Sequence, residues 1–248
     1  RELLKADNDR KTKELDEARA LQLSMLPKKI PQNSNYDIAV YMKPASEVGG
    51  DYYDFKYDED GNLIIAVGDA TGHGMKAGTM VATIKGLFTA EQTNINIAGF
   101  LKRSNDVIKD MMLGNIFMAM LMVKLKDNKA IFSSAGMPPT LIFRKDKNEI
   151  EEIRLKAMPL GGPIDLAYPE KEITLSSGDT IILMSDGFPE LFNEQKDILG
   201  YEIAKNIFAK IADKQPEEII NHLCIEADKW RGSAKQEDDI TFVVVKVK

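Results

Sequence analysis

The first 26 residues carry a helical pattern whose apolar positions are confined to its second half. There, apolar residues recur three and four positions apart, at Leu15, Ala18, Leu21 and Met25. This spacing defines one face of a helix, whereas the first half, "RELLKADNDRKTKELDEAR", is strongly charged and offers few apolar anchors. Pro27 disfavours helical geometry at the residue before it and ends the pattern. We predict a helix over residues 1–26, within a linker segment 1–30 that precedes a globular domain at 31–248.

The rest of the chain alternates between strand and helix patterns. Strand patterns cover residues 36–42, 52–57, 63–67, 117–125, 129–134, 140–143, 180–184 and 240–247. Helical patterns cover residues 73–92, 97–112, 201–212 and 216–230. The strands come in hairpins and the helices in pairs, which favours antiparallel sheets with helices packed outside over a doubly wound parallel sheet. The predicted fold class is therefore α+β.

Composition narrows the class of protein. The chain has 248 residues, 44% of them hydrophobic, which suffices for a substantial core. The net charge of −6 argues against a nucleic-acid binder, and no apolar run approaches the roughly 20 residues that span a bilayer. The single Cys224 cannot form an internal disulfide, so we expect a reducing, cytoplasmic location. Cys224 shares a helical stripe with Leu223 and Ala227, which favours core packing over a catalytic thiol. A chain that begins without Met is expected to be a piece of a longer protein.

Aspartates stand at the ends of several predicted strands, although Asp is disfavoured within strands. They are Asp51 and Asp54 in "GGDYYDF", Asp69 in "VGDATGHG", Asp186 in "MSDGF", and Asp238 and Asp239 in "EDDIT". Carboxylates gathered at one end of a sheet repel each other unless cations lie between them. Hard oxygen ligands suit Mg²⁺ or Mn²⁺. Zinc is disfavoured, because His73, His222 and one cysteine supply too few nitrogen and sulfur ligands.

Each aspartate also has a purely structural interpretation. Asp in "SDG" or "GDA" is commonly a helix cap or a turn residue. Asp58, Glu59 and Asp60 are expected to form only a solvated turn. The pattern alone therefore leaves a metal enzyme and a coincidence of turns equally open.

Six motifs in order distinguish between these interpretations. They are "VGGDYYDF", "VGDATGHGMKAG", "AGMPP", "PLG", "LMSDGFPELFN" and "DDITFVVV". Together they resemble the SpoIIE/RsbU-like branch of the PPM metal-dependent serine/threonine protein phosphatases. The resemblance extends from about residue 21 to the C-terminus, and "ARALQLSMLP" is similar to the linker of that branch. It implies a PPM-type α-β-β-α sandwich of two antiparallel sheets flanked by helices, with two Mg²⁺ or Mn²⁺ ions at one edge.

The resemblance also implies roles for individual residues. Asp69 would bridge both metals, and the carbonyl of Ala70 would add a ligand. Asp51 would serve one metal, and Asp186 and Asp238 the other, with Asp239 as the second choice at the last position.

Two departures from the eukaryotic pattern are visible. Those members place a basic residue near the first motif, whereas here Lys43 and Lys76 are the nearest conceivable substitutes. They also carry a histidine directly after the second motif's glycine, whereas His73 lies further along, at the start of a helix. Support of the turn is therefore favoured for His73 over proton transfer. For Asp54 a supporting role behind the metal ligands is slightly favoured over a turn-forming one.

The implied reaction is hydrolysis by a metal-activated water without a covalent intermediate. The implied substrate is a phosphoprotein, often a STAS-type anti-anti-sigma domain. The implied control is dimer-coupled, through the N-terminal helix and an upstream sensor domain. Two alternatives stay open: a pseudophosphatase that binds its partner without turnover, and a metal-dependent nuclease, against which the acidic charge argues.

Overall fold

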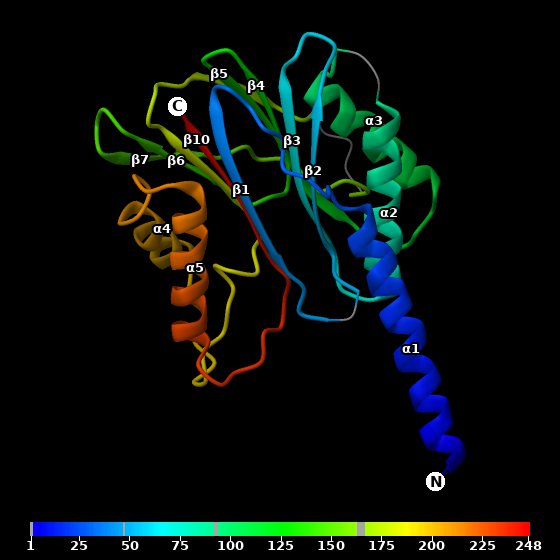
Figure 1. The fold of residues 1–248 in the computed structure, drawn as a ribbon. Coiled ribbons are helices and arrows are strands. Elements are labelled where there is room, and N and C mark those ends of the chain that lie inside the picture. The colour runs from blue at the N-terminus through cyan, green and yellow to red at the C-terminus, as the bar shows by residue number, and fades with distance from the viewer. Residues whose placement is uncertain (1, 47, 92–93, 163–166) are drawn as a thin grey trace.

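The computed structural model describes residues 2–46, 48–91, 94–162 and 167–248 (Figure 1). Within these residues, two antiparallel sheets of five strands each pack face to face, with helices on the outer faces. The first sheet has the order β1-β10-β9-β6-β7, and the second has the order β2-β3-β4-β5-β8. The predicted α+β class, an α-β-β-α sandwich, is confirmed.

The bounds of the elements are as follows. The first sheet contains β1 (Tyr36–Lys43), β10 (Ile240–Val247), β9 (Thr180–Met184), β6 (Thr140–Arg144) and β7 (Glu149–Ile153). The second sheet contains β2 (Asp51–Tyr57), β3 (Leu63–Ala70), β4 (Met118–Lys126), β5 (Lys129–Ala135) and β8 (Glu170–Thr174). The helices are α1 (Glu2–Met25), α2 (Met75–Ala90), α3 (Ile97–Asp110), α4 (Tyr201–Ala209) and α5 (Pro216–Arg231).

The predicted strands and helices are all present, with ends displaced by a few residues. The predicted end of one helix at residue 92 lies outside the described residues. Two strands, β7 and β8, were not predicted. Their sequences, "EIEEI" and "EKEIT", are rich in charge, and both strands lie at sheet edges. Charged side chains are common on edge strands and obscure the apolar alternation by which a strand is recognised.

The buried hydrophobic side chains form three layers. One lies between the second sheet and helices α2 and α3, one lies between the two sheets, and one lies between the first sheet and helices α4 and α5. Alternate residues of β3 point to opposite sides: Ile64 and Ala66 pack under α2 and α3, while Leu63, Ile65 and Val67 pack between the sheets. A third cluster lies between the first sheet and helices α4 and α5, around Phe188, Phe208 and Phe242. Cys224 packs against this third cluster, as predicted, and burial raises the pKa of its thiol.

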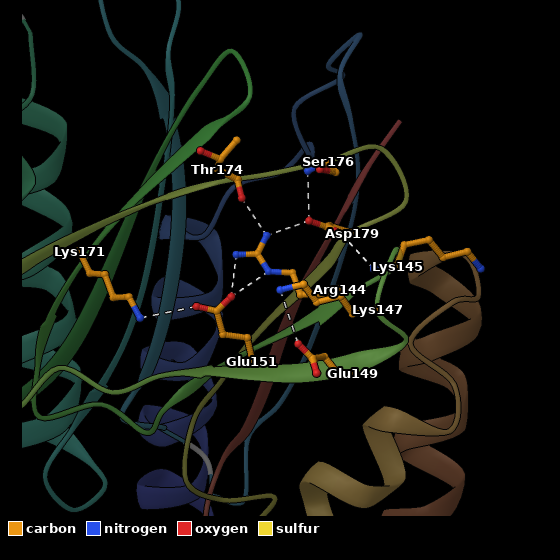
Figure 2. Close-up of polar contacts among 9 residues, drawn as sticks. All are labelled: Arg144, Lys145, Lys147, Glu149, Glu151, Lys171, Thr174, Ser176 and Asp179. Carbon is orange, nitrogen blue, oxygen red and sulfur yellow. Dashed lines mark hydrogen bonds and ion pairs between the residues drawn. The ribbon is translucent and has the colours of Figure 1, made fainter.

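A charged network joins the edges of the two sheets (Figure 2). The Arg144 guanidinium on β6 donates to Glu151 of β7 at 2.8 Å, to Asp179 at 2.9 Å and to the Thr174 carbonyl of β8 at 2.8 Å. Lys171 of β8 also pairs with Glu151, at 3.6 Å. Because β6 and β7 belong to one sheet and β8 to the other, the planar fork of arginine holds the sandwich closed at this edge.

The turn between β2 and β3 is only partly solvated. Glu59 and Asp60 are exposed, as predicted. The prediction is wrong for Asp58, whose side chain is buried. Its carboxylate accepts hydrogen bonds from the backbone and side chain of Asn62 and pairs with Lys124 at 2.8 Å. The carboxylate therefore organises the turn from inside.

Helix α1 packs on α2 by its C-terminal end, and its N-terminal end projects away from the sandwich (Figure 1). In the part of the chain that the structure describes, no helix has the length and apolar character needed to cross a membrane.

Candidate active site

Strand pairing brings the predicted aspartates to one end of the sandwich. In the β2–β3 hairpin, Asp51 lies directly opposite Asp69. In the other sheet, β9 pairs with β10, so that Asp186, just after β9, and Asp238, just before β10, lie at the same end. Both sheets therefore contribute carboxylates to a common location, as the pattern of strand-end aspartates indicated.

A cleft of about 240 Å³ opens at this end. It is lined by Ala45, Ser46, Asp69, Ala70, Thr71, Gly72, His73, Asp186, Glu237, Asp238 and Asp239. Asp51 is buried beside it, and its Oδ2 accepts hydrogen bonds from the hydroxyls of Ser185, at 2.8 Å, and Thr241. A larger groove of about 810 Å³ lies near the start of β1 and contains none of the predicted site residues.

Burial and mutual repulsion oppose the charged form of these carboxylates. Burial, with the nearby charges of Asp51 and Asp186, raises the pKa of Asp69 to about 9. Burial, with the charge of Asp238, raises the pKa of Asp186 to about 6. Burial also raises the pKa of Asp51 well above its usual range and raises that of Asp238. A cluster of this kind binds protons when no metal cation neutralises it.

Three oxygens converge where Gly50 lacks a side chain. A Cβ on Gly50 would lie 2.4 Å from the Ala70 carbonyl oxygen, 3.0 Å from Asp69 Oδ1 and 3.2 Å from the Gly72 carbonyl oxygen. Oxygens gathered in this way are the donors that Mg²⁺ and Mn²⁺ prefer. The glycine before Asp51 therefore leaves room for the oxygens of the neighbouring turn.

Asp186 supplies a further sign that a cation fits. Its Oδ1 is buried and has no hydrogen-bond partner among the described residues. A buried carboxylate oxygen without a donor is unfavourable unless a cation or a proton satisfies it. Among the described residues, no group of three or more acidic, histidine or cysteine side chains has a geometry that could by itself hold a metal ion.

Asp238 and Asp239 have different surroundings. The carboxylate of Asp239 accepts backbone hydrogen bonds from Ala45 at 2.7 Å, Gly50 at 2.7 Å and Asp51 at 3.2 Å. Its oxygens are thus occupied in holding the chain before β2. The carboxylate of Asp238 accepts one hydrogen bond, from the backbone of Asp239, and its backbone carbonyl accepts another from Gln236. The carboxylate of Asp239 is therefore more fully hydrogen-bonded than that of Asp238.

The remaining candidates, which were not proposed as metal ligands, are Asp54, His73, Lys43 and Lys76. Asp54 is buried and binds the Tyr52 hydroxyl at 2.7 Å and Lys85 at 2.6 Å, so it fastens α2 to β2. It lies within β2, so the turn-forming alternative is wrong. His73 lines the cleft together with Asp238. Lys43 and Lys76 do not line the cleft.

Sequence reasoning missed three supporting residues. Ser185 and Thr241 hold Asp51, and each stands in a motif beside a predicted ligand. Gln22 of α1 is buried and exchanges two hydrogen bonds with Gly49, at 2.6 and 3.1 Å. Its place next to Leu21 in the apolar stripe gave no sign of this contact, which depends on how α1 docks.

Comparisons with known proteins agree with this geometry. The sequence profile of the family described as "Stage II sporulation protein E (SpoIIE)" matches residues 59–248. The "Phosphoserine phosphatase RsbU" of Bacillus subtilis (strain 168) is 27% identical over 238 residues, which are 95% of this chain and 70% of that protein. The "Stage II sporulation protein E" of the same organism is 26% identical over 204 residues, which are 81% of this chain and only 24% of that protein.

Solved structures share the fold. The "SiaA-PP2C domain of Pseudomonas aeruginosa" superposes with a TM-score of 0.85 at 22% identity, covering 98% of this chain and 99% of that one. A structure of RsbX in complex with magnesium superposes with a TM-score of 0.63 at 19% identity, covering 89% of this chain and 99% of that one. Since the family profile covers most of the chain, including Asp69, Asp186 and Asp238, the expected resemblance is confirmed, and the chain belongs to the SpoIIE family.

Proposed function

We propose that this chain is a metal-dependent phosphatase of a bacterial signalling pathway that removes phosphate from phosphoserine or phosphothreonine in a protein. The observation that carries the proposal is the meeting of Asp51, Asp69, Asp186 and Asp238, from both sheets, around one cleft. The similarity to a protein named phosphoserine phosphatase supports the same reaction class. The single cysteine is consistent with a reducing, cytoplasmic location.

The residues present fit two Mg²⁺ or Mn²⁺ ions. Asp69 would serve both ions and the Ala70 carbonyl would add a ligand, with Asp51 on one side and Asp186 and Asp238 on the other. The chemistry that such a pair supplies when bound is activation of a water molecule and neutralisation of the phosphoryl oxygens. The free Oδ1 of Asp186 and the oxygens around Gly50 support this assignment.

The chain's own groups would position the reaction. Ser185 and Thr241 fix the orientation of Asp51 through their hydroxyls. His73 is exposed at the cleft and makes no side-chain hydrogen bond among the described residues that would support the turn. Transfer of a proton from His73 to the departing seryl oxygen is the alternative to a role in supporting the turn. Cys224 packs in the core away from the cleft, which agrees with hydrolysis without a covalent intermediate.

The substrate we propose is a phosphorylated STAS-type domain. The alternative, a pseudophosphatase that binds such a partner without turnover, is disfavoured by the complete set of carboxylates. We further propose that residues 1–30 form a regulatory linker to an upstream sensor domain, and that residues 31–248 form the phosphatase domain.

A direct contact supports regulation through α1. Gln22 donates to the Gly49 carbonyl and accepts from the Gly49 backbone amide. Gly49 and Gly50 lead directly into Asp51, and their backbone packs on the Asp239 carboxylate. A shift of α1 would therefore displace the chain that carries Asp51. Leu21 of α1 is 61% exposed, which leaves an apolar surface for pairing with a second copy.

The first test concerns the metals. The purified chain is expected to hydrolyse p-nitrophenyl phosphate with Mn²⁺ or Mg²⁺ and to lose this activity in excess chelator, because the carboxylates alone cannot activate water. Steady-state rates before and after chelation, and after return of the ion, measure this. Activity that survives thorough metal removal would rule the mechanism out.

A second test concerns Asp69. Asp69→Asn is expected to lower turnover by more than about 100-fold, the upper end of the effect of losing an outer-shell partner. His73→Ala serves as the comparison variant, and its turnover is expected to fall by less than that of Asp69→Asn. The assignment fails if Asp69→Asn keeps near-normal turnover or has lost its fold.

The raised pKa of Asp69 predicts that the stability of the metal-free chain depends on pH, and the same variant tests this. A carboxylate whose folded pKa is raised contributes stability that is present at low pH and lost as pH rises through that value. Without metal, wild type should therefore lose stability between about pH 4, the usual Asp value, and about pH 9, the value for Asp69. Asp69→Asn should lose less stability over this pH range, so its melting temperature at pH 8 should equal or exceed that of wild type.

A third test concerns the linker helix. Light scattering is expected to give a dimer for this chain and a monomer for a chain that starts at Pro27, with different phosphatase rates. Gln22→Ala is the matched variant, because it removes the contact with Gly49 and leaves the apolar stripe intact. It should remain a dimer with an altered rate. Monomers with equal rates for both lengths would contradict regulation by the helix.

A further inference from the structure

Two of the six sequence motifs contribute no carboxylate to the cleft. They are "AGMPP", residues 135–139, and "PLG", residues 159–161. In the structure the two motifs pack against each other, because a Cβ on Gly136 would lie 2.7 Å from Cγ of Pro159. The φ of Gly136 is +83°, a conformation that favours glycine. Gly136 therefore lets the chain turn after β5 and leaves room for the second motif.

The "PLG" motif braces the beginning of β4. Leu160 and Met118 exchange two backbone hydrogen bonds, at 2.8 and 3.0 Å. The backbone amide of Gly161 donates to the Asn105 side chain of α3 at 3.0 Å. On the side of β3, Met118 lies opposite Ala70 in the strand register. The beginning of β4 is thus held between the motif and the end of β3, where residues 69–72 form a wall of the cleft.

Just beyond the Ala70–Met118 pair, Thr71 and Phe117 are joined by three hydrogen bonds. The Thr71 amide donates to the Phe117 carbonyl at 2.9 Å, the Phe117 amide donates to Thr71 Oγ1 at 2.8 Å, and Oγ1 donates to the Phe117 carbonyl at 2.9 Å. In a regular antiparallel ladder, two paired residues exchange backbone hydrogen bonds. Here the Thr71 hydroxyl takes the place of the Thr71 carbonyl as acceptor. The chain can therefore leave the strand for the glycine turn while its end stays fixed.

The position of Thr71 also sets the direction of the carbonyl before it. A peptide group is planar and trans, so the Ala70 carbonyl points away from the Thr71 amide. That amide points toward Phe117, on the β4 side of β3, so the carbonyl points to the β2 side. The short distance of 2.4 Å between the Ala70 oxygen and a Cβ placed on Gly50 agrees with this direction. The same oxygen is the backbone ligand assigned above to the metals.

We propose that Thr71 is a positioning residue for the metal site, because its hydroxyl, bonded twice to Phe117, holds the Ala70 carbonyl in the direction in which it would bind a cation. This inference rests on the metal-dependent function proposed above. Thr71 is exposed and Phe117 is half-buried. If the hydroxyl were removed, water could therefore satisfy the Phe117 amide and carbonyl, and the loss of stability would be small.

The test removes the hydroxyl and measures metal binding. Thr71→Val keeps the shape of the side chain without the hydroxyl, and Thr71→Ser keeps the hydroxyl. Thr83→Val is the matched control, because the Thr83 hydroxyl also donates to a backbone carbonyl at 2.9 Å, that of Thr79, and Thr83 does not line the cleft. Calorimetry on each metal-free chain gives the Kd for Mn²⁺, and a melting curve without metal reports on the fold. Rates on p-nitrophenyl phosphate at saturating Mn²⁺ give KM.

Thr71→Val should raise the Kd for Mn²⁺ about tenfold, the lower end of the effect of losing a group that orients a metal ligand. Its melting temperature without metal, and its KM for the ester at saturating Mn²⁺, should stay close to those of wild type. Thr71→Ser and Thr83→Val should bind Mn²⁺ as wild type does.

Other results would overturn the proposal in recognisable ways. It is wrong if Thr71→Val leaves the Kd for Mn²⁺ unchanged, or if Thr71→Ser or Thr83→Val raises it equally. A raised KM with an unchanged Kd would show that Thr71 contacts the substrate instead of orienting a ligand. A raised Kd with a clearly lower melting temperature would assign the effect to the fold. If wild type itself binds no Mn²⁺, the metal site falls, and the function proposed above falls with it.

Discussion

The repulsion among buried carboxylates at one end of the sandwich is the constraint on which the rest of the structure depends. Asp51 and Asp69 face each other across a strand pair, and Asp186 and Asp238 approach from the other sheet. Burial and the neighbouring charges raise the pKa of Asp69 to about 9. An arrangement this unfavourable persists only because the surrounding fold enforces it, and it becomes favourable when cations are bound.

The fold enforces it through strands that cannot shift. β3 is buried on both faces, which fixes its register and hence the position of Asp69. The chain before β2 is fixed by the Asp239 carboxylate, which accepts three backbone amides, and by glycines that admit close approach. Gln22 adds a contact from α1 to this same chain. Among the described residues, the chain before β2 thus contacts both Asp239 and α1, which is the contact through which we propose that the helix acts.

Most of the fold could be predicted because apolar alternation and helical spacing were strong in the buried elements. β7 and β8 could not, since edge strands rich in Glu and Lys lack that signal. Asp58 looked like a solvated turn residue because its partner Lys124 is distant in sequence. The strand-end aspartates were visible as candidates. Their common location and the ranking of Asp238 before Asp239 were also expected, whereas the three backbone hydrogen bonds that the Asp239 carboxylate accepts depend on the path of the chain before β2 and could not be.

We propose that the carboxylate cluster is a metal site in which Asp69 holds a proton until cations are bound. Titration of the metal-free chain with Mn²⁺ by calorimetry at pH 7.5, in two buffers of different ionisation enthalpy, tests it most directly. About two ions should bind per chain, with release of protons because the pKa of Asp69 lies above the working pH. Absence of binding, or binding without any proton release, would contradict the account.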